Sequence, residues 1–82
     1  MKRKKTGKIL NTYAIFDPAI EGGYNVSFPS FPGCVTFGET FDKAKSMAAE
    51  ALSLWIEELQ SQKLPILPSG MRPIIDEISF AV

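Results

Sequence analysis

Hydrophobic and polar residues alternate along the first half of the chain, and the hydrophobic spacing lengthens to about 3.6 after Thr40. Alternation among β-branched and aromatic residues is typical of a strand with one buried face. Asp17-Pro18 and Gly22-Gly23 predict a turn between two antiparallel strands. Tyr24 to Phe28 and Cys34 to Phe37 have the alternating pattern, and Ile9 to Phe16 is rich in β-branched and aromatic residues, so all three segments predict strands.

Two prolines, Pro29 and Pro32, direct the chain from the second predicted strand into the third. Pro29 ends the second strand because proline has no amide hydrogen to donate to the ladder. In the third strand, Val35 and Phe37 share one face and Cys34 lies on the other. We expect Cys34 to be buried and inert, since no basic residue stands close to it in the sequence to favour the thiolate.

A long helix is predicted to begin after Thr40, whose hydroxyl is placed to accept a backbone amide two or three residues later. Asp42 then lies in the first turn, where the helix dipole favours a negative charge. The helix should end near Lys63, because Pro65 disfavours helical geometry at Leu64. Its expected apolar face consists of residues spaced by three and four, with one more at its margin: Phe41, Ala44, Ala48, Ala51, Leu52, Trp55 and Leu59, with Ile56.

The C-terminal part of the chain predicts a loop and one further strand. Leu64 to Pro73 contains three prolines and a glycine, which favour a loop. Ile74 to Val82 predicts the last strand, in which alternate residues share a face: Ile78, Phe80 and Val82. The order β-β-β-α-β predicts an α+β fold, in which a small, mostly antiparallel sheet carries one long helix on one face.

The charge is divided unevenly along the chain, although it sums to zero. Five of the nine basic residues lie within the first eight positions, so residues 1–8 are expected to form a basic, flexible tail. Residues 9–82, the single expected domain, hold nine acidic and four basic residues, a net charge of −5. An acidic body suits a basic partner, and the tail is either a solubilising terminus or a weak contact to an acidic partner.

The composition excludes several classes of chemistry. The chain has no histidine, which removes the usual general base at neutral pH and the commonest metal ligand. Its single cysteine allows no internal disulfide. No apolar run approaches the roughly 18 residues of a membrane span, and no signal-peptide pattern follows the N-terminal lysines. We therefore expect a cytoplasmic protein without a cofactor, a metal or membrane contact.

The segment GGYNVSFPSFPGCVTFGETFDKA, residues 22–44, resembles the HicB antitoxin family. The resemblance extends over roughly residues 12–80, and the paired prolines followed by glycine and cysteine are its most specific part. Each residue is a weak signal alone, and the likeness rests on the set: Gly23, Tyr24, Val26, Phe28, Pro29, Pro32, Gly33, Cys34, Thr36, Gly38, Thr40, Ala44 and Ala51.

This resemblance implies a partial ribonuclease-H-like fold of β-β-β-α-β order and a non-enzymatic binding protein. The implied partner is HicA, a small basic ribonuclease that cuts messenger RNA, and the implied assembly is a dimer or a tetramer. Many HicB-like proteins also carry a C-terminal DNA-binding domain. This chain stops at the last predicted strand, so we expect no specific nucleic-acid binding by the chain alone. The alternative is a solitary HicB-like regulatory or scaffold module without a toxin.

Acidic residues provide the candidate sites. Glu50, Glu57 and Glu58 lie outside the apolar face of the predicted helix, and two of them lie late in it, where the dipole disfavours negative charge. We interpret them as a partner-binding surface, beside the simpler reading of an ordinary solvated face. A second, weaker hypothesis is a degenerate metal-dependent ribonuclease that uses Asp17, Glu50 and Asp76. These three carboxylates equally suit a turn, a helix surface and a strand end.

Overall fold

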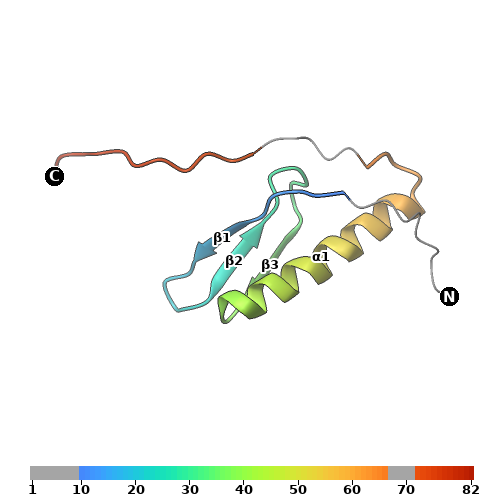
Figure 1. The fold of residues 1–82 in the computed structure, drawn as a ribbon, viewed down its shortest axis with the longest axis horizontal. Coiled ribbons are helices and arrows are strands. Elements are labelled where there is room, and N and C mark those ends of the chain that lie inside the picture. The colour runs from blue at the N-terminus through green and yellow to red at the C-terminus, as the bar shows by residue number, and fades with distance from the viewer. Residues whose placement is uncertain (1–9, 67–71) are drawn as a thin grey trace.

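The computed structural model describes residues 10–66 and 72–82, so the predicted tail of residues 1–8 lies outside the described residues. A three-stranded antiparallel sheet in the order β1-β2-β3 precedes a single long helix (Figure 1). The predicted α+β class and the order β-β-β-α are therefore confirmed. The elements are β1 (Ile15–Pro18), β2 (Tyr24–Ser27), β3 (Val35–Gly38) and α1 (Phe41–Ser61).

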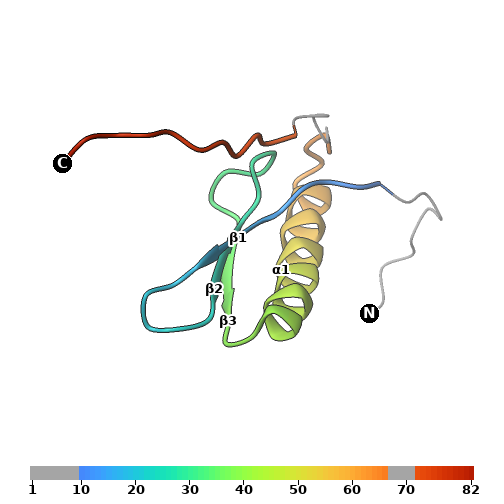
Figure 2. The same ribbon diagram turned by 60° about the vertical axis from the view of Figure 1, so that its left-hand side comes forward.

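The register of the sheet assigns its two faces. Phe16 pairs with Val26, and Val26 pairs with Thr36, so this row lies on one face. Val26 belongs to the buried core, against which α1 packs, and this row therefore faces the helix. The helix covers that face, and no element of the described chain covers the opposite face of the sheet (Figure 2). The fold thus has two layers with one thin core between them.

The first strand begins later than the sequence predicts. Ladder pairing begins at Ile15, which pairs with Ser27, the last residue of β2. Ser27 is followed by Phe28 and Pro29, where the chain turns away from the ladder. Residues 10–14 therefore have no partner strand in the described chain, despite their strand-like pattern. The predicted strand residue Ile9 lies outside the described residues.

Two successive turns connect β2 to β3. The Phe31 amide donates to the Phe28 carbonyl and the Cys34 amide donates to the Phe31 carbonyl, and each N···O distance is 3.0 Å. A proline occupies the second position of each turn, where its fixed φ is favourable. Gly33 takes the third position of the second turn with a φ of +98°, which is the geometry of a type II turn. Phe28 and Phe31 enter the core from these turns, so the proline pair positions two buried rings.

The helix begins and ends through specific caps. At its start, the Lys43 amide donates to the Thr40 hydroxyl over 3.1 Å, which confirms the predicted N-cap. At its end, Lys63 adopts a positive φ of 57°, and the Leu64 amide donates to the Leu59 carbonyl. Together with the bond from the Lys63 amide to the Gln60 carbonyl, this is a Schellman motif. The helix thus stops two residues before the predicted Lys63.

The helix and β3 approach each other closely at Gly38. A Cβ atom at this position would lie 2.8 Å from the Ala44 Cβ and nearer still to the Ala44 amide nitrogen and Cα. Ala44 is fully buried at this contact. Two small residues therefore allow the first turn of α1 to lie directly on the sheet. The buried residues of the core are Val26, Phe28, Phe31, Cys34, Ala44 and Ala48.

The predicted apolar face of the helix is largely confirmed. Ala44 and Ala48 are buried, and the later residues of the face are half-buried against the core. Trp55 packs beside the Pro32-Gly33 turn, where a Cβ on Gly33 would lie 3.3 Å from the indole ring. Phe41 differs, because 47% of it remains exposed at the margin of the face. The residues of the helix that are half-buried against the core are Ala51, Leu52, Trp55, Ile56 and Leu59.

The fifth predicted element requires a correction. Residues 72–82 contain no strand, and the sheet in the described chain has three strands. The segment runs as an extended arm away from the domain (Figure 1). A strand exists only where a neighbouring strand takes up its amide and carbonyl groups, and this segment has no such neighbour in the single chain. The alternating pattern of Ile74 to Val82 is present, but the pairing that it predicts is not.

Cys34 is buried, as predicted, with its sulfur 3.9 Å from the Ala51 carbonyl oxygen. Burial raises the pKa of the thiol from its ordinary 9.0. The neutral thiol therefore favours the folded state below pH 9, and this contribution is lost as the pH rises through the raised pKa.

We therefore expect the free energy of unfolding to fall more steeply above pH 9 in the wild-type protein than in Cys34→Ala. Urea denaturation at several pH values on both sides of 9 measures this difference. The other titrating groups are common to both proteins and cancel in the comparison. Identical pH profiles for the two proteins would contradict the assignment of a buried, protonated thiol.

Candidate partner-binding surface

The solvent-facing side of α1 carries the acidic residues that the sequence singled out. Glu50, Glu57 and Glu58 are all exposed on the helix. Glu50 and Glu57 are two turns apart, so their side chains leave the same side of the helix about 10 Å from each other. Glu58 follows on the adjoining line, and its carboxylate accepts a hydrogen bond from the Gln62 side chain. The helix thus presents a short acidic surface, which consists of these three glutamates.

The basic residues of the helix do not neutralise this acidic surface. Lys43, in the first turn of the helix, pairs with Glu39, which precedes the helix, at a distance of 3.4 Å. The Lys45 ammonium lies over the Phe41 ring, 5.5 Å from its centroid. The last turn contains no basic residue. Within the described chain, Glu50 and Glu57 therefore have no ion-pair partner, and their negative charge is available to an external cation.

A second exposed surface lies on the uncovered face of the sheet. Val35 and Phe37 are on this face and are 66% and 43% exposed. They border a shallow hollow of about 500 Å³ with Asp17 and Asn25. The sequence predicted that Val35 and Phe37 share a face, but it did not identify that face as exposed. The signal in the sequence was Gly38, which lies on the other face of β3. Only a glycine fits there beneath the helix, so Val35 and Phe37 must lie on the face that the helix does not cover.

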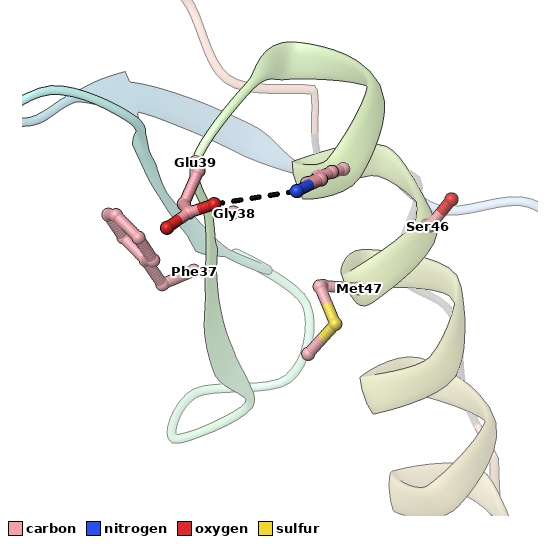
Figure 3. A pocket seen from close by; sticks show the side chains of 6 residues that line it. Phe37, Gly38, Glu39, Ser46 and Met47 are labelled. Atoms are coloured by element: carbon pink, nitrogen blue, oxygen red, sulfur yellow. Dashed lines mark hydrogen bonds and ion pairs between the residues drawn. The ribbon is translucent and has the colours of Figure 1, made fainter.

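The end of β3 and the first turns of α1 form a smaller hollow (Figure 3). Phe37 and Met47 project on either side of it, and the ion pair between Glu39 and Lys43 crosses its rim. Met47 is 40% exposed. This hollow connects the uncovered sheet face with the flank of the helix, so one partner is able to contact both.

The three carboxylates of the nuclease hypothesis are not brought together. Asp17 lies on the uncovered face of the sheet, whereas Glu50 is on the helix on the opposite side. Asp76 lies in the extended arm, where its carboxylate accepts the Glu77 amide over 2.8 Å. Among residues 10–66 and 72–82, no three His, Cys, Asp or Glu residues gather in a group able to hold a metal ion. This arrangement offers no two-metal site of the kind that ribonuclease-H chemistry requires.

No helix in the described part of the chain has the length and apolar character needed to cross a membrane. The exposed sheet face and the acidic helix surface resemble surfaces with which proteins contact other proteins. Aromatic and aliphatic side chains lie beside polar groups on the sheet, and exposed carboxylates without an ion-pair partner among the described residues lie along the helix.

Comparison with known proteins supports a family assignment. The model of the "HicB_like antitoxin of bacterial toxin-antitoxin system" family matches residues 13–81. The UPF0150 protein ssr1765 of Synechocystis is 32% identical over 59 residues, which cover 72% of this chain and 75% of that protein. Antitoxin HicB 1 of Photorhabdus laumondii is 40% identical over 52 residues, which cover 61% of this chain. The matched region spans only 34% of that second protein.

No solved structure shows significant similarity to this chain. The family match nevertheless covers nearly all of the described fold, from Tyr13 to Ala81. The chain therefore belongs to the HicB-like antitoxin family of bacterial toxin–antitoxin systems.

Proposed function

We propose that this protein is an antitoxin that neutralises a small, basic, mRNA-cleaving toxin of the HicA type by direct protein–protein contact. The observation that carries the proposal is the acidic surface on α1, whose glutamates form no ion pair with any residue that the structure describes. Membership of an antitoxin family supports a toxin as the partner. A ribonuclease that binds RNA phosphates must carry positive charge, so such a surface is complementary to it.

The acidic surface acts by competing with RNA for the basic residues of the toxin. Opposite charges accelerate encounter and orient the two proteins before they touch. Val35 and Phe37, with Met47 on the helix flank, then supply apolar contact area beside the charges. Apolar burial contributes roughly 25 cal/mol per Å², so these side chains add affinity that charge alone does not provide.

The same proposal includes a cytoplasmic homodimer or tetramer. A domain of this size has a thin core, and its large exposed apolar side chains favour association with a second copy. The chain alone is proposed not to bind specific nucleic-acid sequences, because residues 9–82 carry a net charge of −5 that repels phosphates.

Two alternatives make different predictions. A solitary HicB-like regulatory or scaffold module would have no toxin beside its gene. A degenerate metal-dependent ribonuclease would cleave RNA by itself with magnesium or manganese, which the separation of Asp17, Glu50 and Asp76 disfavours.

The experiment that tests the proposal is co-expression with the short, basic reading frame adjacent to this gene. Expression of that neighbour alone should arrest growth, and co-expression of this protein should restore it. A further arm assays the purified protein alone with RNA and magnesium, where no cleavage is expected. An adjacent frame that is toxic but not rescued would contradict the proposed function.

A further inference from the structure

The arm formed by residues 74–82 displays a row of unburied apolar side chains. Ile78 is 78% exposed and Phe80 83% exposed, and the other members of the row are at least as open to solvent. Residues two apart in an extended chain project to the same side, so the row forms one apolar face. The opposite face begins with Ile75 and then carries Glu77, Ser79 and Ala81. The apolar row consists of Ile74, Ile78, Phe80 and Val82, with Asp76 as its one polar member.

The outer edge of β1 is a free sheet edge, to which an additional strand can bind. In the described chain β1 pairs only with β2, so one of its two edges has no ladder partner. The helix packs mainly on β3 and β2, and the β1 side of the covered face ends in a cluster of aromatic rings. Phe16 and Tyr24 meet the Phe41 ring at centroid distances of 5.0 and 5.9 Å. Phe41 is nevertheless 47% exposed there, so this end of the core lacks a cover.

The two faces of the arm fit the two faces of β1. A strand added beside β1 with Ile78 and Phe80 toward the helix would extend the apolar row of Phe16 and Val26. Its other face would place Glu77 and Ser79 beside the row of Asp17 and Asn25, which is polar and solvated. The edge of β3 fits less well, because Val35 and Phe37 occupy its solvated face and α1 already lies on its other face.

The arm also leaves the domain close to this edge. The Arg72 guanidinium lies 5.8 Å from the centroid of the Tyr13 ring, and Tyr13 stands two residues before β1. From there residues 74–82 extend away from their own sheet in both views (Figures 1 and 2). Within the arm, the Asp76 carboxylate accepts the Glu77 amide, and no bond to β1 is made by the described residues.

We propose that residues 74–82 add as an outer strand to the β1 edge of a second copy of this chain, and that the second copy returns its own arm. Such an exchange is isologous, so it closes at two copies and leaves neither the arm nor the β1 edge unpaired. The apolar row of each arm then covers the Phe16, Tyr24 and Phe41 rings of the other copy. This inference names the second copy and its contact, and it does not depend on the proposed toxin.

The test compares variants on the two faces of the arm in the full-length protein. We expect light scattering at tens of micromolar to give twice the 9.0 kDa of one chain for the wild type. A double variant, Ile78→Asp with Phe80→Asp, should halve the mass and keep the helical circular dichroism signal, because both side chains are almost fully exposed in the single chain. Ser79→Asp is the matched control on the polar face and should leave the mass doubled.

A mixed sample of isotope-labelled and unlabelled chains separates exchange from closure onto the same chain. Exchange predicts nuclear Overhauser effects between the Phe80 ring of one copy and the Phe16 or Tyr24 ring of the other. Such contacts found only within one chain, a wild-type monomer, or a double-aspartate variant that remains dimeric would each overturn the proposal. A wild-type monomer would also contradict the homodimer or tetramer proposed above. None of the three outcomes bears on toxin binding, so failure here is distinguishable from failure of the proposed antitoxin activity.

Discussion

Replacement of Gly38 by alanine is expected to lower the free energy of unfolding by about 3 kcal/mol or more. The added methyl group would clash with backbone atoms, and a change of side-chain rotamer cannot relieve that clash. The new Cβ would meet the Ala44 backbone, which belongs to the first turn of α1. The helix must then move off β3, and the buried contacts of Ala44 and Ala48 open with it. A domain of this length has a free energy of unfolding of only about 4–12 kcal/mol, so this one substitution removes a large part of it.

Gly22→Ala provides the matched control. A Cβ at Gly22 meets nothing within 4 Å, and its cost is confined to the strain of a φ of +103°. We expect this strain to cost about 1–2 kcal/mol, since it is a local backbone penalty. Urea denaturation followed by circular dichroism measures both variants. A Gly38→Ala protein as stable as Gly22→Ala would show that the close approach of helix and sheet does not hold the fold together.

Reversal of the acidic surface is the second change with a large expected effect. The triple variant Glu50→Lys, Glu57→Lys and Glu58→Lys should slow association with a basic toxin by about a hundredfold at low salt, because it converts electrostatic attraction into repulsion. Stopped-flow or surface-binding kinetics at two salt concentrations measures the effect. The difference between wild type and variant should shrink as the salt concentration rises.

Two controls distinguish this effect from damage to the fold. Lysines late in a helix interact favourably with its dipole, so the triple variant should be at least as stable as the wild type. Glu21→Lys changes charge in the turn between β1 and β2, away from the helix, and should alter the association rate much less. An association rate that is unchanged in the triple variant would remove the helix from the proposed interface.

Local chemistry made most of the fold predictable. Thr40 caps the helix as its side chain allows, and the proline pair with Gly33 builds the turns that its residues favour. The boundaries that differ depend on distant partners. The strand-like run before Ile15 remains unpaired because β2 turns away after Ser27, and no residue near the start of the chain encodes that limit.

The C-terminal arm shows the same dependence more strongly. Its alternation correctly describes a chain segment with one apolar face, but alternation does not specify which edge receives the strand or whether that edge belongs to the same chain. The exposure of Glu50, Glu57 and Glu58 was predictable from the helical period. The exposure of Val35 and Phe37 was harder to predict, because it depends on where the helix packs, and the local signal for this is the small residue Gly38 on the opposite face of β3.

The most direct measurement titrates this protein into an RNA-cleavage assay of the toxin that we propose as its partner. We expect RNA cleavage to fall to background near one antitoxin chain per toxin, and we expect the triple Glu→Lys variant not to inhibit at the same concentrations. Cleavage that continues at full rate in the presence of excess wild-type protein would contradict the proposed function. Equal inhibition by wild type and triple variant would contradict the role assigned to the acidic surface of α1.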